Sequence, residues 1–593
     1  MAQAGEPPVN LRAALRRVTR NVQVILSLLA VAIGLTAGLA AIGFRTIIDQ
    51  VQRFGFGFGG EQMVTLVSAL PSWRILLVPT AGGLLIGLFV HFFMPGRRPQ
   101  GVAEVIEANA LRGGRMPLAA GLKAALVSAV SIGAGASVGR EGPVVHLGAS
   151  LGAWASRRLH LGRTASRTLL GCGVAAAVAA SFNAPIAGTF FALEVVVGHY
   201  ALTAFAPIVI SAVIGTMVSR MHYGDFPAFI LPETTTIASF WEFPAFALLG
   251  VVCAVMAIIF MRSIMWTEDM MDKTPVPRWA RPALGGLAVG VIALAYPHVL
   301  GVGYEATDAA LSELYPLGLL VALIALKMAA TAISLGCGFG GGVFSPSLFI
   351  GAMVGGAFGI LATSAFPELS SGHGAYTIIG MGAVAGAVLG APISTILMVF
   401  ELTNDYAITI AVMIATSIAS LITEQTRGHS YFTWQLARRG IAVKGGQDVG
   451  LLRTIKARDL ITKNFETVAP EAPIATVRER LQRAPWGELF VTDADGHLSG
   501  VITFSDLHDA AFDTSLDATL VADDVARKHP TVLLADDDLE SALGAYGASG
   551  ETNLPVVEDR ETMRLVGVAP QHEVMLAYQR ALDQPRAEAR GEV

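Results

Sequence analysis

Apolar segments that approach the length of a membrane-spanning helix recur between residues 22 and 424 of this 593-residue chain. An α-helix needs about 20 predominantly apolar residues to cross a bilayer. Hydrophobic residues make up 53% of the chain and charged residues only 15%, which excludes an ordinary soluble protein. Several segments are broken by Gly or Pro, and broken helices at membrane depth line a cavity or a binding site. The sequence predicts a multi-pass, all-α membrane domain with apolar segments at 22–42, 75–93, 202–218, 246–261, 284–295, 317–333, 378–400 and 408–422.

The membrane region contains an internal repeat. Residues 139–143 read Gly-Arg-Glu-Gly-Pro and residues 342–346 read Gly-Val-Phe-Ser-Pro, each followed by a glycine five residues after its proline. Ala-Pro-Ile recurs at 184–186 and 391–393, each copy followed by a glutamate nine residues after its proline. The two pairs are offset by 203 and 207 residues. Interrupted helices at matching positions of two halves predict a transporter-type fold, in which the substrate binds near the middle of the membrane between half-helix ends.

Glu141 places a carboxylate inside the first interrupted segment. An ionisable side chain at bilayer depth costs about 2.5–3.5 kcal/mol on insertion scales, so it indicates a pathway or a pairing. The neighbouring glycines expose backbone N–H groups, and the start of a helix favours negative charge, so these surroundings suit an anion. We interpret Glu141 as a carboxylate that competes with a permeating anion for one site. The alternative is a structural ion pair with Arg140.

From about residue 450 the chain changes character, because acidic residues and strand-like segments appear and apolar runs shorten. This tail also repeats, and each copy reads as strand, helix, strand, strand, helix. We interpret this pair of small α/β units as a cytoplasmic regulatory module. The three cysteines lie scattered in apolar segments and predict neither a disulfide framework nor a metal cluster. The matching segments of the two copies are 467–468 with 531–532, 489–491 with 554–556, and 500–501 with 567–568.

Basic residues flank the membrane region at both ends. By the tendency of positive charge to stay on the cytoplasmic side, both termini are expected in the cytoplasm, in a plasma or inner membrane. The residues concerned are Arg12, Arg16, Arg17 and Arg20 before the first apolar segment, and Arg438 and Arg439 after the last.

Four segments together resemble the CLC family of chloride channels and proton/chloride antiporters, in the prokaryotic type that carries a C-terminal pair of CBS domains. They are residues 139–143, 341–346, 398–406 and 499–507, and the resemblance covers nearly the whole chain. It implies a multi-pass all-α membrane protein with an inverted internal repeat, followed by a cytoplasmic α/β CBS-domain pair. It also implies a homodimer with one independent anion pathway in each subunit.

The expected domains follow from this resemblance. They are an N-terminal cytoplasmic segment at 1–21, a transmembrane domain at 22–440 with its repeat boundary near 230–245, a linker at 441–455, a first CBS domain at 456–513, a second CBS domain at 520–580, and a flexible tail at 581–593.

The resemblance also implies roles for residues at the two pentapeptides. Glu141 matches the gating glutamate of the family, which fills the outer anion site as a carboxylate and opens the path when it is protonated or swings away. The backbone amides of Arg140, Gly142, Val343 and Phe344 are expected to line the anion path. For Phe344, ordinary packing of the ring is the alternative, and both roles are compatible.

Two positions depart from the family pattern of the central anion site. The family commonly has a Gly-Ser-Gly-Ile-Pro motif where this chain has 99–103, so Gln100, next to Gly101, stands in place of the serine hydroxyl. A glutamine amide still donates a hydrogen bond, but it is larger and also carries an acceptor. The family tyrosine of the last helix aligns with Phe432, and a shift of one residue would place Tyr431 there. The selectivity among chloride, bromide, nitrate and fluoride is therefore open.

A third departure concerns protons. Antiporters of the family usually carry a second glutamate on the cytoplasmic side, which passes protons toward the gate, and this position holds Val195. Valine cannot carry a proton, so the favoured function is a chloride channel that is gated by a protonatable glutamate and regulated by CBS domains. A proton/chloride antiporter is the first alternative, because some members move protons without that carboxylate. An exporter of fluoride or another anion is the second.

The C-terminal repeat raises the question of a nucleotide. Thr503 and Asp506 match the Thr/Asp pair that often holds an adenosine ribose in CBS domains, whereas Pro570 and Glu573 stand at the equivalent positions of the second copy. An adenine nucleotide at one site is one interpretation, and a module without ligand is the other. No cofactor is expected to be required, and chloride is the expected ligand.

Other function classes fit the sequence less well. A membrane enzyme that cradles phosphate in the glycine-rich loop would need the Lys-Ser/Thr of a P-loop or a nucleophile with its base, and neither pattern is present. A divalent-cation transporter would need more carboxylates in the pore segments. The chain is therefore expected not to be an enzyme, and its expected partners are lipid, anions and a second copy, with no nucleic acid.

Overall fold

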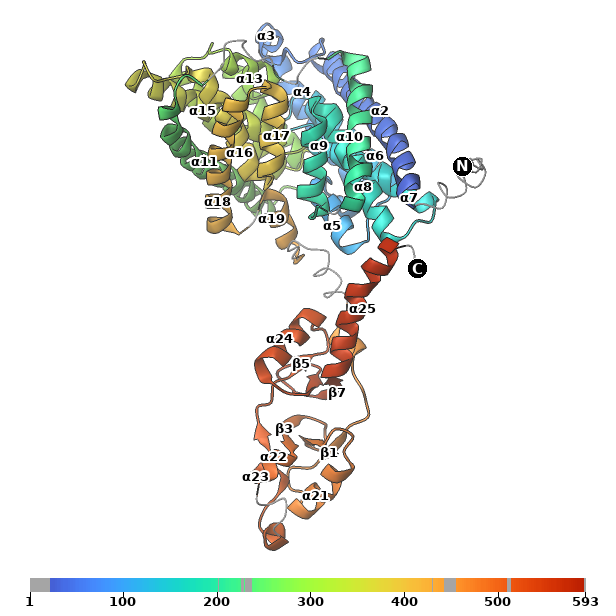
Figure 1. Ribbon diagram of the computed structural model, residues 1–593. Coiled ribbons are helices and arrows are strands. Elements are labelled where there is room, and N and C mark those ends of the chain that lie inside the picture. Colours follow the sequence, from blue (N-terminus) through green and yellow to red (C-terminus); the bar gives the residue numbers. More distant parts are fainter. Residues whose placement is uncertain are drawn as a thin grey trace, which may run out of the picture. The chain divides into compact units, whose positions relative to one another are not determined.

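The structure is a computed structural model that describes residues 22–200, 202–225, 229, 237–428, 430–441, 455–508 and 514–590. Contacts divide the chain into a membrane unit, Met1–Val443, and a C-terminal unit, Lys444–Val593 (Figure 1). The predicted order, an all-α membrane region followed by an α/β tail, is confirmed. The N-terminal arginines Arg12, Arg16, Arg17 and Arg20 lie outside the described residues, as do residues 230–236 of the predicted repeat boundary and 442–454 of the predicted linker.

The first half of the membrane unit is built from helices that differ widely in length. Two short turns interrupt the helices of this half: η1 (Pro95–Arg97) is a 3-10 turn and η2 (Ala192–Val197) is a π-helical turn. The helices are α2 (Val22–Phe56), α3 (Met63–Ser68), α4 (Ser72–Phe93), α5 (Val102–Leu111), α6 (Leu118–Gly133), α7 (Glu141–Arg158), α8 (Arg163–Phe182), α9 (Pro185–Phe191) and α10 (Leu202–Tyr223).

The second half repeats the pattern of short helices between long ones. Its helices are α11 (Phe243–Lys273), α12 (Arg281–Ala295), α13 (Tyr304–Leu311), α14 (Leu317–Gly336), α15 (Phe344–Ala365), α16 (His373–Leu389), α17 (Pro392–Thr403), α18 (Tyr406–Arg427) and α19 (Tyr431–Ala437), with 3-10 turns η3 (Phe240–Glu242) and η4 (Pro297–Val299). Among the described residues, eight helical segments are long and apolar enough to cross a membrane. In Figure 1 the first-half helices gather on one side of the unit and most second-half helices on the other, with α9 beside α17.

The predicted apolar segment 378–400 is two helices rather than one. α16 ends at Leu389, Gly390 adopts φ +65°, and Pro392 starts α17. α8 and α9 are broken in the same way at Asn183, which adopts φ +59°. The breaks follow from the Ala-Pro-Ile tripeptides, because proline cannot continue a helix but suits the first turn of a new one.

Glycines let the helices of each half approach closely. A Cβ on Gly173 would lie 1.9 Å from the Gly148 carbonyl oxygen, where α8 packs on α7. In the second half, a Cβ on Gly380 would lie 2.5 Å from the Gly351 carbonyl oxygen, where α16 packs on α15. Small residues at such crossings allow the backbone contact that holds helices together in lipid. Both contacts involve glycines that follow the two repeated pentapeptides.

Reciprocal contacts join the two halves. The Glu401 carboxylate accepts hydrogen bonds from the backbone N–H groups of Ile186 and Ala187, at 2.9 and 2.7 Å, and so caps the start of α9. The Glu194 carboxylate accepts from Ile393 and Ser394 at 3.0 and 2.8 Å, and caps the start of α17. Negative charge at a helix start satisfies N–H groups that have no partner within the helix. Each half therefore completes a helix of the other.

Two buried serines make a second reciprocal pair. The Ser131 hydroxyl on α6 accepts from the Gly340 N–H at 3.0 Å, and the Ser334 hydroxyl on α14 accepts from the Ser137 N–H at 3.1 Å. In each case the acceptor lies in one half and the donor just before the pentapeptide of the other. These bonds fix the two loops that lead into α7 and α15.

The C-terminal unit contains two small sheets. The first has strand order β1-β2-β3-β4, with β1 parallel to β2 and the other pairs antiparallel. The second has order β5-β6-β7, with β5 parallel to β6 and β6 antiparallel to β7. The strands are β1 (Glu466–Val468), β2 (Glu488–Thr492), β3 (Leu498–Thr503), β4 (Arg527–Lys528), β5 (Leu533–Leu534), β6 (Asn553–Val557) and β7 (Leu565–Pro570). The helices are α21 (Ile474–Arg483), α22 (Phe504–Leu507), α23 (Ala522–Val525), α24 (Leu539–Ser549) and α25 (Gln571–Arg590), with 3-10 turns η5 (Ala457–Asp459) and η7 (Thr514–Ala518).

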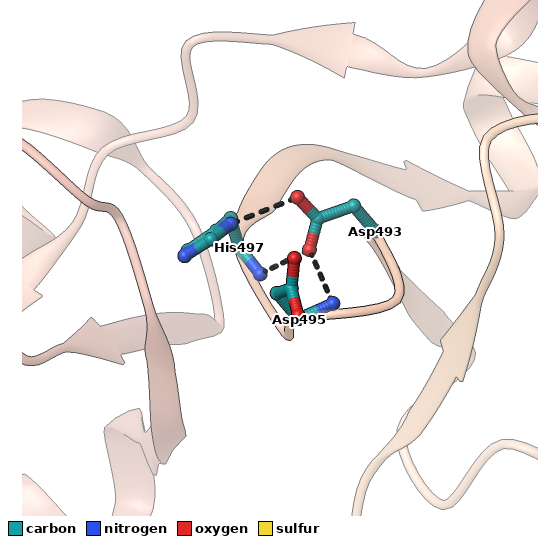
Figure 2. A group of neighbouring side chains, drawn as sticks. All are labelled: Asp493, Asp495 and His497. Carbon is teal, nitrogen blue, oxygen red and sulfur yellow. Dashed lines mark hydrogen bonds and ion pairs between the residues drawn. The ribbon is translucent and has the colours of Figure 1, made fainter.

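The turns before β3 and β7 link the two copies of this unit. The Leu498 N–H donates to the Met563 carbonyl at 2.9 Å, and the Leu565 N–H donates to the Gly496 carbonyl at 3.0 Å. The first turn is closed by Asp493, which accepts from the backbone N–H of His497 and from its ring Nδ1, both at 2.8 Å (Figure 2). These bonds lower the pKa of Asp493.

Candidate functional site

The starts of α7 and α15 meet backbone to backbone inside the membrane unit. The Gly139 N–H donates to the Gly342 carbonyl at 2.7 Å, and the Gly342 N–H donates back to the Gly139 carbonyl at 2.8 Å. A Cβ on Gly342 would lie 3.1 Å from the Gly142 nitrogen, so the approach depends on glycine. The first N–H groups of a helix have no acceptor within it, and two such ends that converge form a site for negative charge.

Glu141 occupies this junction. It is the first residue of α7, and only 1% of its surface is exposed. Its Oε1 accepts a hydrogen bond from the Tyr304 hydroxyl at 2.8 Å, and its Oε2 accepts one from the Ser345 hydroxyl at 2.5 Å. A Cβ on Gly139 would lie 2.9 Å from Oε2 and 3.0 Å from the Ser345 nitrogen, so the carboxylate reaches the first turn of α15. The carboxylate stands where the two helix ends would hold an anion.

Arg140 binds chiefly to a residue other than its neighbour. Its Nη1 lies 2.9 Å from Glu61, whereas its Nε lies 3.8 Å from Glu141 Oε1. Glu61 also accepts from Arg45 at 2.9 Å, and the Arg140 guanidinium lies over the Tyr304 ring, 4.5 Å from its centroid. The alternative reading of Glu141 as the ion-pair partner of Arg140 is therefore weakened, because Glu61 has the shorter contact.

A large cavity of about 650 Å³ approaches the junction from one side. Gln100, Gly101, Gly142, Val343, Tyr431 and Phe432 line it, so six of the predicted anion-site residues share one space. Its lining carries more basic than acidic side chains, which favours anions. The basic residues are Arg97, Arg98, Arg278, Arg281, Arg438 and Arg439, and the acidic ones are Glu104, Glu268 and Asp272.

Three of the cavity-lining residues already have partners of their own. The Gly101 N–H donates to Glu104 at 2.7 Å, which caps α5. The Tyr431 hydroxyl accepts from the Gln435 side chain at 3.0 Å, and the rings of Tyr431 and Phe432 lie edge to face. Both aromatic residues at the start of α19 line the cavity. An aromatic residue therefore reaches it whether the family tyrosine aligns with Phe432 or, after a shift of one residue, with Tyr431.

A separate small pocket of about 40 Å³ includes Arg140, Tyr304 and Glu61. Gly142 lines the large cavity and Arg140 lines the small pocket, so the two sequence neighbours of Glu141 face different spaces. Phe344, its counterpart in the second half, packs its ring against Phe182 and Phe191, with centroid distances of 4.9 and 5.7 Å.

The predicted site residues of the pathway thus lie close together, and their anion-binding roles stay predictions. The sequence analysis missed Tyr304 and Ser345. Ser345 lies inside the second pentapeptide and could have been examined there. Tyr304 lies 163 residues from Glu141, and no spacing or motif connects the two.

Val195 lies in the π-helical turn η2, half-buried against the apolar core. The neighbouring Glu194 carboxylate faces the start of α17, where Ser394 donates to it from both the backbone and the hydroxyl. The carboxylate adjacent in sequence to position 195 is therefore engaged in capping a helix.

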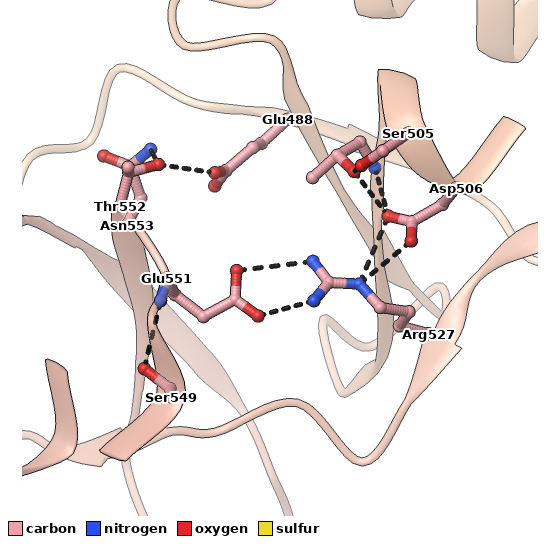
Figure 3. Close-up of polar contacts among 9 residues, drawn as sticks. Glu488, Ser505, Asp506, Arg527, Ser549, Glu551, Thr552 and Asn553 are labelled. Carbon is pink, nitrogen blue, oxygen red and sulfur yellow. Dashed lines mark hydrogen bonds and ion pairs between the residues drawn. The ribbon is translucent and has the colours of Figure 1, made fainter. Parts of the chain in front are cut away.

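In the C-terminal unit, Thr503 and Asp506 bond to each other. The Thr503 N–H and hydroxyl donate to the Asp506 carboxylate at 2.8 and 2.6 Å. Arg527 lies 3.1 Å from the same carboxylate and also binds Glu551, as Figure 3 shows. The bond to Glu551 raises the pKa of the Arg527 guanidinium. A ribose at this place would compete with Arg527 for Asp506, and nucleotide binding stays a prediction.

Known proteins resemble this chain over both units. The family model for the voltage gated chloride channel matches residues 82–424, and the CBS domain model matches residues 457–513. The chain is 33% identical over 410 residues to the putative chloride channel protein ClcB-like of Ralstonia nicotianae, which covers 68% of this chain and 95% of that protein.

Solved structures share the fold. A slow cyanobacterial Cl−/H+ antiporter aligns with a TM-score of 0.62 and 24% identity, over 70% of this chain and 97% of that one. A eukaryotic CLC transporter aligns with a TM-score of 0.62 and 18% identity, over 92% of this chain and 97% of that one.

Proposed function

This chain belongs to the voltage-gated chloride channel family, as its motifs predicted, and from that premise we propose that it is a chloride channel gated by Glu141. The observation that carries the proposal is the place of the Glu141 carboxylate, buried where two helix starts meet, with its sequence neighbours Gly142 and Arg140 lining different cavities. Chain segments from both halves of the repeat contribute to this junction. An anion that crosses the junction must displace the carboxylate.

The gating mechanism follows from charge. An ionised Glu141 places its negative charge at the starts of α7 and α15, where the helix N–H groups favour an anion, and so excludes chloride from that place. A protonated Glu141 gives up that charge, so chloride competes successfully for the same N–H groups. We infer that the small pocket faces the outside, because the large cavity carries Arg438 and Arg439, which are expected to be cytoplasmic. External acid then opens the pathway.

Passive conduction is favoured over coupled transport because position 195 carries no proton-binding group and Glu194 caps α17. A coupled antiporter is the alternative, since a structurally similar protein is described as a Cl−/H+ antiporter. Export of fluoride or another anion is a further alternative. Gln100 and Phe432 leave the selectivity of the central site open.

Several further properties belong to this proposal. The protein forms a homodimer in the plasma or inner membrane with both termini in the cytoplasm. The C-terminal unit regulates the pathway as a pair of CBS domains, at 456–513 and 520–580. An adenine nucleotide binds near Thr503 and Asp506, and no other cofactor is required.

The test uses purified full-length protein in liposomes loaded with KCl, with valinomycin present and no protonophore. Chloride efflux and external pH are recorded together. We expect rapid chloride loss without proton uptake, as a passive channel requires. Fixed-ratio proton uptake that accompanies chloride loss would contradict the channel and establish the antiporter.

Glu194→Gln separates two routes in the second case. If proton uptake persists in this variant, protons reach Glu141 without the carboxylate next to position 195. If proton uptake stops while chloride efflux continues, Glu194 carries protons in addition to capping α17.

A further inference from the structure

Tyr304 is the first residue of α13 and reaches Glu141 from a distant part of the chain. We propose that its hydroxyl is a latch, a positioning group that holds the ionised Glu141 carboxylate in the closed position and thereby sets the external pH at which the pathway opens. Ser345 supplies the second bond of the latch. The inference rests on the proposed gating role of Glu141.

Each oxygen of the Glu141 carboxylate accepts one hydrogen bond. The Tyr304 hydroxyl donates to one oxygen and the Ser345 hydroxyl donates to the other. All three side chains are buried, so water does not replace a bond that breaks. A hydroxyl binds an ionised carboxylate more strongly than a protonated one, since charge-assisted hydrogen bonds are the strong ones. The latch therefore stabilises the ionised, closed state over the protonated, open state.

Tyr304 is held firmly in place. Gly303 adopts φ +95° and turns the chain into α13, a conformation that favours glycine. The buried Lys327 ammonium donates to the carbonyls of Val299 and Gly301, at 3.0 and 2.9 Å, and fixes the loop before that turn. The Phe229 ring packs edge to face on the Tyr304 ring with a centroid distance of 5.0 Å. The hydroxyl therefore has little freedom to leave Glu141.

Charged groups surround the latch on the side of the small pocket. Arg140 lies over the Tyr304 ring and binds Glu61, whose side chain is 41% exposed and also binds Arg45. Asp49 and Glu305 line the same pocket, and Lys327 lies behind Gly303. Arg140 and Lys327 favour an ionised Glu141, whereas Glu61, Asp49 and Glu305 oppose it. Because substitution of Tyr304 by phenylalanine changes none of these charges, it isolates the hydroxyl.

The test measures chloride efflux from liposomes as a function of external pH. We expect Tyr304→Phe to move the midpoint of opening to higher pH by about one unit, which corresponds to the loss of one hydrogen bond to a charged group. Ser345→Ala should shift it in the same direction. Tyr376→Phe is the matched control, since that buried tyrosine donates to Glu242 at 3.2 Å in another part of the unit. Its midpoint should equal that of the wild type.

The Glu141→Gln background distinguishes the latch from a structural role. If Tyr304 acts through the carboxylate, Tyr304→Phe has no further effect on the pH profile once Glu141 is replaced. A wild-type midpoint in Tyr304→Phe, or an equal shift in Tyr376→Phe, would overturn the latch while Glu141→Gln still opens the pathway. If Glu141→Gln itself keeps the wild-type pH profile, the proposed gate fails rather than the latch.

Discussion

The two halves of the membrane unit bring the same backbone to the pathway but different side chains. Both pentapeptides start with a glycine that bonds to the other, and both place proline in the first turn of the helix that follows. In the first half, Arg140 and Glu141 supply charge. In the second half, Val343 and Phe344 supply apolar surface, and Ser345 supplies a hydroxyl. The repeat thus builds one symmetric backbone frame at the proposed anion site and gives its two halves different side chains.

This difference assigns distinct tasks to the halves. The frame depends on contacts that occur twice, such as the Ser131 and Ser334 bonds, and a frame of this kind needs both copies. The proposed gate is a single carboxylate, Glu141, and Phe344 stands at the matching position of the second half. We therefore expect changes to the frame to affect stability in similar ways from either half, and changes to the gate to affect function from one half only.

Replacement of Glu141 tests the asymmetry and carries the largest expected effect. The protonated fraction of a carboxyl falls about tenfold for each pH unit above its midpoint. Two units above the wild-type midpoint, Glu141→Gln should conduct chloride about 100-fold faster than the wild type, because glutamine never ionises. Efflux from liposomes at a series of external pH values measures this.

The matched control is Glu401→Gln, which changes a carboxylate of the second half that caps a helix. Its pH profile should keep the wild-type shape. A Glu141→Gln variant that still closes at high external pH would show that this carboxylate is not the gate.

The two serines test the symmetry. Ser131→Ala leaves the Gly340 N–H without its acceptor, and Ser334→Ala does the same to the Ser137 N–H. An unsatisfied buried N–H costs about 1–3 kcal/mol, so each variant should unfold at a lower temperature by a similar amount. Thermal unfolding of the purified protein in detergent measures both.

Ser364→Ala serves as the control, because this exposed serine on α15 bonds only to a carbonyl of its own helix. This substitution should leave the unfolding temperature nearly unchanged. A large loss in one buried-serine variant with none in the other would break the symmetry of the frame.

The smallest expected effect lies in the C-terminal unit, where the two copies also differ at one matched position. Glu488 starts β2 and Asn553 starts β6. Burial raises the pKa of Glu488, and its Oε2 has no hydrogen-bond partner among the described residues. A raised folded-state pKa gives stability that is present below the unfolded-state pKa and is lost as pH rises through the folded value.

Glu488→Gln should therefore stabilise this unit by about 1 kcal/mol at pH 7 and by less near pH 4. Hydrogen exchange of β2 in the full-length protein measures the change. Glu558→Gln, at an exposed carboxylate 3.8 Å from Arg564, should leave the protection of β2 unchanged both at pH 7 and near pH 4. Equal protection in Glu488→Gln and the wild type at pH 7 would mean that the ionised carboxylate is well solvated.

The repeat made much of this fold predictable. The Ala-Pro-Ile tripeptides mark the starts of α9 and α17, and the pentapeptides mark the starts of α7 and α15, because Gly and Pro act through local backbone geometry. The break between α16 and α17 nevertheless falls inside 378–400, which was predicted as one apolar segment. The predicted family and fold class are confirmed. The domain boundaries stay predictions, although the contacts divide the chain at 443–444, close to the predicted linker.

Of the two partners of Glu141, Tyr304 was beyond the reach of the sequence. A tyrosine that follows Gly303 carries no local sign that its hydroxyl will meet a carboxylate on another helix. The same holds for Glu61, which comes to Arg140 from the turn before α3. Such pairs depend on how the helices cross. A single sequence, read alone, indicates where helices start but not how they cross.

The exchanged caps of α9 and α17 also bear on how the chain is made. When the first half leaves the ribosome, the N–H groups of Ile186 and Ala187 have no carboxylate, because Glu401 lies more than 200 residues downstream. α9 stays incomplete until translation passes that codon and the second half inserts. During synthesis the first half therefore lacks a contact that its folded state needs. Until the second half has been made, we expect the first half to depend on the insertion machinery.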